Sequence, residues 1–136
     1  MLQEIRFRNL EKPREKKLRT DIRWVCNSFG FVAGRDIECV SEKIVEDLLL
    51  HYPRNGPILS EGLANDLDIS LARVNHHLRN LMEAGLLYRH KRFIVLRGGS
   101  LKSAVEEIRK DVNRILDDLT VVAEDVDKRL GMKNRA

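Results

Sequence analysis

Side chains able to bind phosphates and to read base edges gather between residues 70 and 92. Arginine and lysine bind phosphate oxygens, arginine also pairs with the two acceptors of guanine, and asparagine and histidine hydrogen-bond bases or backbone. On a helix with Val74, Leu78 and Leu81 turned inward, most polar residues of this segment face outward. The candidate nucleic-acid contacts on this helix and the hairpin that follows are Ser70, Ala72, Arg73, Asn75, His76, Arg79, Asn80, Arg89, Lys91 and Arg92.

The net charge of +4 hides a strong segregation along the chain. Residues 69–98 hold six basic groups and one acidic group, and residues 1–23 hold eight basic and four acidic groups. Residues 36–68, between them, hold eight acidic groups and only two basic ones. A basic block beside an acidic one is typical of a protein that binds a polyanion, although chance clustering on solvated faces gives the same pattern.

The spacing of the residues supports metal binding, thiol chemistry and catalysis less well than nucleic-acid binding. Both cysteines fall on apolar faces of predicted helices, where thiols are usually buried, so metal and redox sensing are minor alternatives. His77 flanks the predicted core and is expected to pack there. No catalytic motif is present, so the protein is not predicted to be an enzyme, and no cofactor is expected. The possible metal ligands, which form no CxC or CxxC pair, are Cys26, Cys39, His51, His76, His77 and His90.

The length of 136 residues and the hydrophobic content of 43% suit one small domain with helical extensions. No apolar run approaches the roughly 18 residues of a membrane span, and residues 1–8 lack the apolar core of a secretory signal. Two cysteines thirteen positions apart make no disulfide framework. These features predict a soluble protein of the cytoplasm that does not contact a membrane.

Hydrophobic periodicity and breaker residues predict a mainly α chain with one small hairpin. Ser60 and Ser70 are the expected N-caps of two consecutive helices, and Gly85 is the expected left-handed residue that ends the second. Residues 1–13 hold one possible strand, and residues 28–36 are a tight connection in which a ligand or partner contact stays open. The predicted helices cover residues 14–29, 36–52, 60–67, 70–84 and 100–130, and the predicted strands cover 57–59, 86–89 and 93–96.

This element order predicts a winged helix-turn-helix domain over residues 36–98. A basic arm and helix precede it in residues 1–35, and a long helix follows in residues 99–136. In such a domain the second helix of the turn motif enters the major groove of double-stranded DNA, and the hairpin wing lies beside the phosphates. The alternative is a winged-helix assembly module that binds protein or non-specific nucleic acid.

Residues 70–87, SLARVNHHLRNLMEAGLL, resemble the recognition helix and wing entry of ArsR-type and MarR-type regulators. The resemblance extends over about residues 57–97 and implies a transcriptional regulator that binds DNA as a homodimer through flanking helices. Asn75 stands where those families usually have serine, and the wing lacks their common glycine. The sequence identifies no metal or small-molecule effector.

The C-terminal segment carries a heptad seam from Leu101 to Val126. Its apolar stripe widens at Leu116 and Ala123, which predicts contact with both a partner's copy of the helix and the N-terminal helix. The alternative is that the helix folds back on its own domain. A capping box of Ser103 and Glu106 is expected near its start. The expected dimer-interface residues are Leu18, Ile22, Val25, Leu101, Val105, Ile108, Val112, Ile115, Leu119, Val122 and Val126.

Overall fold

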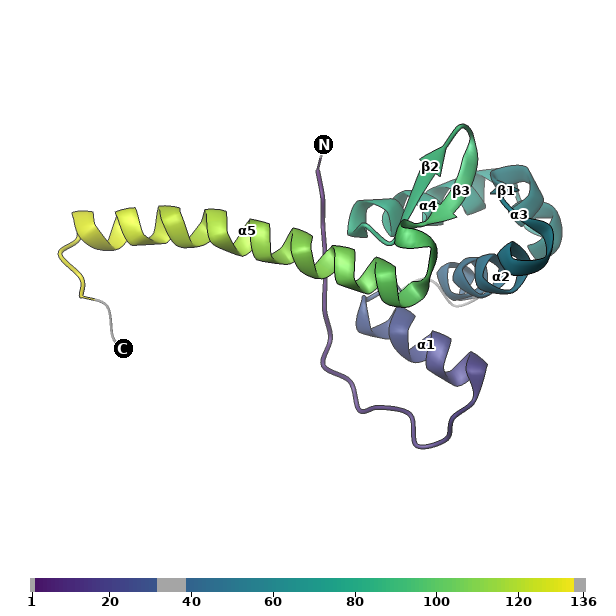
Figure 1. Cartoon of the computed structure of the whole chain (residues 1–136), viewed down its shortest axis with the longest axis horizontal. Helices are drawn as coiled ribbons and strands as arrows, with labels where there is room; N and C mark the ends of the chain where they lie inside the picture. The colour runs from purple at the N-terminus through teal and green to yellow at the C-terminus, as the bar shows by residue number, and fades with distance from the viewer. Residues whose placement is uncertain (1, 32–38, 134–136) are drawn as a thin grey trace.

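A computed structural model describes residues 2–31 and 39–133 (Figure 1). It confirms a mainly helical winged helix-turn-helix, in which one short strand precedes the paired helices and a hairpin that follows them completes a small sheet. The elements in chain order are α1 (Leu18–Ser28), α2 (Val40–Asn55), β1 (Ile58–Leu59), α3 (Ser60–Leu67), α4 (Leu71–Ala84), β2 (Leu87–His90), β3 (Phe93–Leu96), the 3-10 turn η1 (Arg97–Gly99) and α5 (Leu101–Arg129).

The three strands form one antiparallel sheet in the order β1-β3-β2. Ile58 of β1 lies opposite Ile94 of β3, and β2 pairs with β3 from Leu87↔Leu96 to His90↔Phe93. The alternating side chains of β3 turn Ile94 into the core, because successive strand residues point to opposite faces. The sheet therefore closes one side of a core to which every helix contributes. The largest fully buried side chains of that core include Ile44, Leu63, Leu78, Leu81, Leu86, Leu87, Ile94 and Ile108.

The ends of α4 are formed as the sequence predicts. The Ser70 hydroxyl accepts a hydrogen bond from the backbone N–H of Arg73 at 3.2 Å, which satisfies one of the free donors of the first turn. At the other end Gly85 adopts φ 92°, and the N–H groups of Gly85 and Leu86 donate to the carbonyls of Met82 and Leu81. This is the Schellman arrangement, which a residue with a Cβ adopts only with strain.

Two predicted caps are wrong. Ser60 is the first residue of α3, not its N-cap, and its hydroxyl accepts from the Arg89 guanidinium instead. The cap of α5 is Ser100, whose hydroxyl accepts from the N–H of Ser103, so Ser103 is an N3 residue rather than the start of a capping box. The N-cap position of α3 is Leu59, which provides no side-chain cap, whereas at α5 a second serine three residues earlier takes the capping role.

Several predicted boundaries also shift. The helix expected from residue 36 begins at Val40, because Cys39 takes a left-handed conformation with φ 55°. It runs through Pro53 to Asn55 and closes with the Gly56 N–H donating to the carbonyl of Tyr52. The first helix begins at Leu18 rather than residue 14, and residues 32–38 lie outside the described part of the chain.

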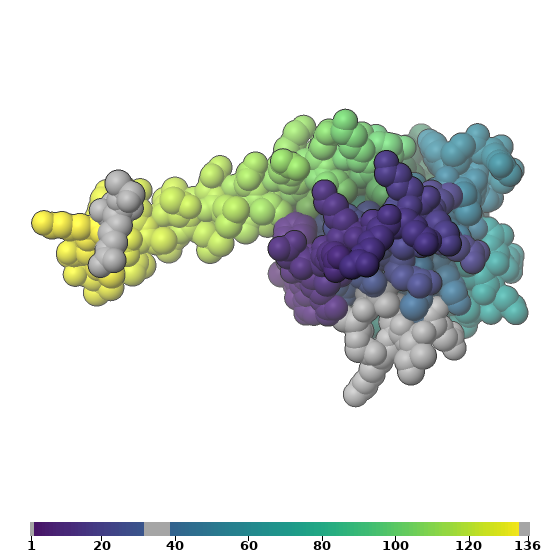
Figure 2. All heavy atoms as spheres, turned by 90° about the horizontal axis from the view of Figure 1, so that it is seen from below, coloured from purple at the N-terminus to yellow at the C-terminus, as the bar shows by residue number. Residues whose placement is uncertain are grey.

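The N-terminal arm, residues 2–13, forms no strand. It runs as an extended segment past α1 and the base of α5, as Figures 1 and 2 show. Its backbone N–H groups at Glu4 and Arg8 donate to the carbonyls of Glu83 and Ser28, and the Phe7 ring packs on Phe29 with centroids 5.6 Å apart. Two isolated backbone bonds attach the arm without the repeated ladder that defines a strand.

A buried carboxylate joins the arm to the winged domain and to α5. Asp111 of α5 accepts from Gln3 Nε2 at 2.7 Å, from both terminal nitrogens of Arg97, and from Arg114 Nη2 at 3.3 Å. Arg97 Nη1 also donates to the carbonyl of Gly85, at the end of α4. Hydrogen bonding by Arg97 is the main cause that lowers the pKa of Asp111 to about 2. This network fixes the direction in which α5 leaves the domain.

The heptad seam of α5 divides into two halves that behave differently. In the first half Ile108 is buried in the chain's own core, and Val105 and Val112 are half-buried. The second half projects away from the rest of the chain (Figure 1), and Leu119 and Val122 are about 60% exposed. The base of α5 therefore packs on its own domain, which is only part of what the alternative interpretation expects. The distal half has nothing over it in the described part of this single chain.

Candidate nucleic-acid interface

The exposed face of α4 is set by three side chains that point the other way. Val74, Leu78 and Leu81 are fully buried, and each contributes roughly 1.5–3 kcal/mol through burial, so the rotation of the helix is strongly determined. The opposite face of α4 carries two arginines with no carboxylate among its exposed residues, since Glu83 is half-buried. The residues of this face that the structure leaves exposed are Ala72, Arg73, His76, Arg79 and Asn80.

His77 is half-buried on the edge of α4 and connects it to α2. Its Nδ1 lies 3.1 Å from the Ser41 hydroxyl, and its ring meets the His76 ring edge-on with centroids 5.2 Å apart. The prediction that His77 packs against its neighbours is confirmed. Only His76 of the two histidines is exposed on the candidate interface.

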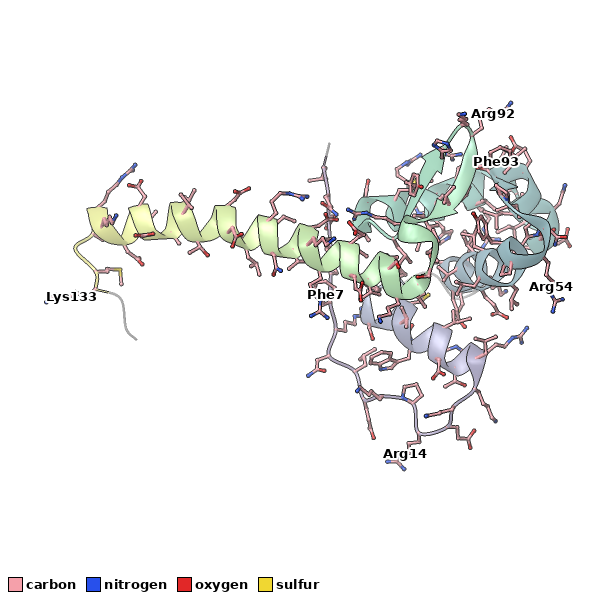
Figure 3. All side chains as sticks on the ribbon, in the orientation of Figure 1. Phe7, Arg14, Arg54, Arg92, Phe93 and Lys133 are labelled. Carbon is pink, nitrogen blue, oxygen red and sulfur yellow. The ribbon has the colours of Figure 1, made fainter. Side chains whose placement is uncertain are left out.

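The wing ends in a two-residue turn made of Lys91 and Arg92. Both residues have positive φ, 49° and 75°, which is the type I′ geometry that asparagine and glycine favour. Both side chains are exposed, and Figure 3 shows Arg92 at the tip of the hairpin. Two cations are held there in a conformation that costs an L-residue roughly 1–2 kcal/mol in its left-handed form. The turn therefore presents charge at the expense of stability.

Replacing Lys91 with Asn and Arg92 with Gly should separate these two effects. The free energy of unfolding should rise by up to about 1 kcal/mol, because both new residues tolerate positive φ. Affinity for any duplex should fall, and the slope of log K against log salt should flatten by at most about two units. Urea denaturation and a salt titration of duplex binding measure the two quantities. A loss of stability, or an unchanged salt slope, would contradict this account of the turn.

Arg89 does not join Lys91 and Arg92 at the wing tip. Its guanidinium turns back toward the helices, where Nη1 donates to the Ser60 hydroxyl at 2.9 Å and Nη2 donates to Asn75 Oδ1 at 3.2 Å. Ser60 is buried at the start of α3, and Asn75 is half-buried on α4. Arg89 thus connects the wing to both helices of the turn motif. Sequence spacing alone could not show this, because the three residues are 14 and 29 positions apart.

Acidic side chains lie behind this face, on the supporting helices. Asp47 of α2 and Asp66 of α3 are neighbours, and burial, followed by hydrogen bonding between the two carboxyl groups that favours the protonated form of Asp47, raises the pKa of Asp47 to about 6. His51 Nδ1 is 3.9 Å from Asp66 Oδ2. Even so, no group of three or more His, Cys, Asp or Glu side chains suited to a metal occurs among the described residues.

The two thiols give no sign of a reactive site within the described chain. Cys26 is fully buried, and burial followed by the charge of Glu42 raises the pKa of its thiol to about 12. The thiolate is the reactive form, so Cys26 is protected from oxidants at neutral pH. Cys39 is half-buried at the start of α2. Of the connection at residues 28–36, only residues 28–31 are described.

An apolar cavity of about 240 Å³ lies between the end of α2, β3 and the first turn of α5. Leu49, Tyr52, Val95 and Leu101 are among its lining residues. It is smaller than the roughly 300–1,000 Å³ of typical ligand sites, and it offers few polar groups to orient a ligand. The cavity therefore gives no chemical indication of an effector.

The expected dimer residues are placed in three different settings. Ile22 and Ile108 are buried within the chain's own core, so they are not surface in the single chain. Val25, Leu101, Val105 and Val112 are half-buried. The remaining expected residues are exposed, and they are Leu18, Ile115, Leu119, Val122 and Val126.

Sequence reasoning missed Asp111, which is not among the candidate residues predicted from the sequence. The available signal was its position on the same side of the helix as Ala104 and Ile108, both of which are buried. A carboxylate on a buried face needs a partner, and that partner is Arg97.

Comparison with known proteins agrees with this geometry. Residues 50–89 match the family model described as bacterial regulatory protein, arsR family. The match runs from the end of α2 through the turn motif into β2. No curated protein and no solved structure gives a significant match to the chain. None of the described helices is both long and apolar enough to cross a membrane.

Proposed function

We propose that this chain, a DNA-binding transcriptional regulator with an ArsR-type winged helix-turn-helix, recognises specific sequences of double-stranded DNA as a homodimer. The observation that carries the proposal is the face of α4, where Arg73 and Arg79 are exposed opposite a fully buried stripe. The proposed place of action is the cytoplasm, where a regulator of the bacterial type meets DNA.

The proposed docking puts α4 in the major groove. The groove is wide enough for a helix, and each base pair shows a distinct set of donors and acceptors along its edge. Ser70, Arg73 and Asn75 belong to the first turns of α4, which in helix-turn-helix proteins contact the bases. The wing then carries Lys91 and Arg92 along the phosphate backbone, where they add affinity without sequence information.

The distal half of α5 supports the homodimer. An apolar stripe over Ile115, Leu119, Val122 and Val126 lies on a helix that projects from the domain. A second copy of the same stripe would cover it, and a two-fold axis would then place two recognition helices in successive major grooves, roughly 34 Å apart. Binding to two linked half-sites would multiply the modest affinity of one domain.

Substituting Arg73 or Arg79 with Ala should test the recognition face. Each change should weaken binding to the selected sequence by roughly 1–3 kcal/mol if the arginine pairs with a base. Lys102→Ala is the matched control, because Lys102 is equally basic and exposed but lies at the base of α5. Fluorescence anisotropy with the selected duplex measures the three affinities. If all three match the unmodified protein, α4 does not enter the groove.

A salt titration distinguishes DNA binding from the assembly-module alternative. Neutralised phosphates release counterions, so a DNA-binding protein gives a steep decline of log K with log salt. Selection from a random duplex pool then separates specific from non-specific binding. A palindromic motif supports the proposal, whereas a steep salt slope without any enriched sequence leaves only non-specific binding.

A further inference from the structure

We infer that Arg89 sets the base preference of the recognition helix by fixing the orientation of the Asn75 amide. The inference rests on the proposed function, in which α4 reads the major groove. Arg89 here is a positioning residue: it acts through Asn75, and the base-reading group is the amide.

The orientation of the amide follows from the chemistry of its partner. An arginine guanidinium has only donors, whereas an asparagine amide has an oxygen that accepts at one end and an NH₂ group that donates at the other. Arg89 Nη2 lies 3.2 Å from Asn75 Oδ1. The flipped amide would set NH₂ against the guanidinium, donor against donor, and lose this bond. The Asn75 oxygen is therefore committed to the wing, and the free end of the amide is Nδ2.

Arg89 is itself held in place, so it does not simply follow the amide. Its Nη1 donates to the Ser60 hydroxyl at 2.9 Å, and Ser60 is 5% exposed. Its backbone is paired within the sheet opposite Ile94, which is fully buried. The position of the Arg89 guanidinium is therefore set by its bond to Ser60 and by the pairing of its strand. The Asn75 amide takes its orientation from Arg89 rather than the reverse.

The fixed amide changes which base Asn75 can read. A free asparagine pairs with adenine through two bonds, accepting from N6 with its oxygen and donating to N7 with its NH₂ group. Because Arg89 holds the Asn75 oxygen toward the wing, the NH₂ group is the end of the amide turned away from Arg89 and left to meet a base. Guanine presents two acceptors, N7 and O6, on its major-groove edge and is the base that best matches a donor-only group. The arrangement predicts guanine, not adenine, at the position that Asn75 contacts.

The experiment is selection of bound sequences from a random duplex pool with the unmodified protein and with Arg89→Met. Methionine is of similar length but cannot donate, so it releases the Asn75 oxygen. We expect the unmodified protein to prefer guanine over adenine at one position by at least about fivefold, the lower end for a good base pairing. With Arg89→Met that position should change to adenine while the others keep their preferences. Asn75→Ala identifies the position, because it should abolish the preference there alone.

A second variant keeps the hydrogen bond from Arg89 and changes the group at position 75 that contacts the base. Asn75→Asp retains an oxygen for Arg89 and replaces the NH₂ donors with an acceptor, so the same position should change from guanine to cytosine, which offers an N4 donor. Thermal denaturation checks that Arg89→Met stays folded, and Asn75→Asp tests independently that the side chain at position 75 reads this base. The inference is overturned if the unmodified protein prefers adenine there, if a folded Arg89→Met keeps guanine, or if Asn75→Asp leaves the base unchanged. Absence of any enriched sequence with the unmodified protein overturns the proposed sequence specificity itself, which is a different result.

Discussion

Leu119→Asp is expected to convert the proposed dimer into a monomer and to lower affinity for a two-half-site operator by roughly 10²–10⁴-fold. Leu119 is 59% exposed in the single chain, so the fold of the chain does not depend on its burial. In a pair of α5 helices it would be covered by the partner, and a carboxylate there would lose its water without gaining a counter-charge. The two recognition domains would then bind their half-sites independently.

Light scattering at tens of micromolar measures the oligomeric state, and operator titration measures the affinity. Thr120→Asp is the matched control, since it adds the same charge one residue further along α5, away from the seam. The control should stay dimeric. An unmodified protein that is already monomeric at this concentration contradicts the dimer, and the two-half-site arrangement with it.

Asp111→Ala is expected to destabilise the chain by about 3 kcal/mol. Removing one partner of a buried ion pair leaves the other uncompensated, which typically costs 3–5 kcal/mol. Arg97 keeps some access to water, so the lower end applies. Gln3 loses its acceptor by the same change, which detaches the N-terminal arm from α5. Asp118→Ala, one heptad along on an exposed surface, should change stability by less than about 0.5 kcal/mol.

The same network gives a pH dependence of defined sign. The pKa of Asp111 is lowered from 3.8 to about 2 in the folded chain, so its contribution to stability is fully present above pH 4. The contribution of Asp111, about 2 kcal/mol, is lost as the pH falls from 4 toward 2. The contribution of Asp47 to stability depends on pH in the opposite direction. Its pKa is raised to about 6, so this contribution is present below pH 4 and is lost as the pH rises through 6. Urea denaturation between pH 2 and pH 5 measures the free energy of unfolding of the unmodified protein and of Asp111→Ala. The part of the difference between the two proteins that comes from ionised Asp111 should shrink as the pH falls from 4 toward 2. Parallel profiles would contradict the assigned role of Asp111.

Local patterns in the sequence were sufficient to predict the order of helices and strands in the winged helix-turn-helix domain. Val74, Leu78 and Leu81 recur at helical spacing, Ser70 and Gly85 bound the helix, and two short apolar runs flank the basic turn. Each signal acts within a few residues through backbone hydrogen bonding or side-chain periodicity. These short-range effects placed α4, its exposed face and the wing without knowledge of any tertiary contact.

The sequence also indicated an apolar seam on α5, but periodicity does not say what covers it. A repeat of apolar residues is satisfied equally by the chain's own core and by a partner. The tertiary structure divides the seam into two halves. Ile108 and Asp111 are buried against the domain in the first half, whereas Leu119 and Val122 are exposed in the second half, which projects beyond the domain. Only the packing of distant elements could locate that division.

Hydrogen bonds between distant residues were decided by the tertiary structure alone. Arg89 was expected among the DNA contacts at or beside the wing tip, yet it meets Ser60 and Asn75, because the sheet register and the α3–α4 packing bring all three together. Gln3 reaches Asp111 across 108 positions of the chain. Such pairs leave no periodic trace, since a polar side chain carries the same sequence signal whether it is solvated or paired. The residue types on the interface were thus determined locally, whereas the partners that orient them depend on the folded chain.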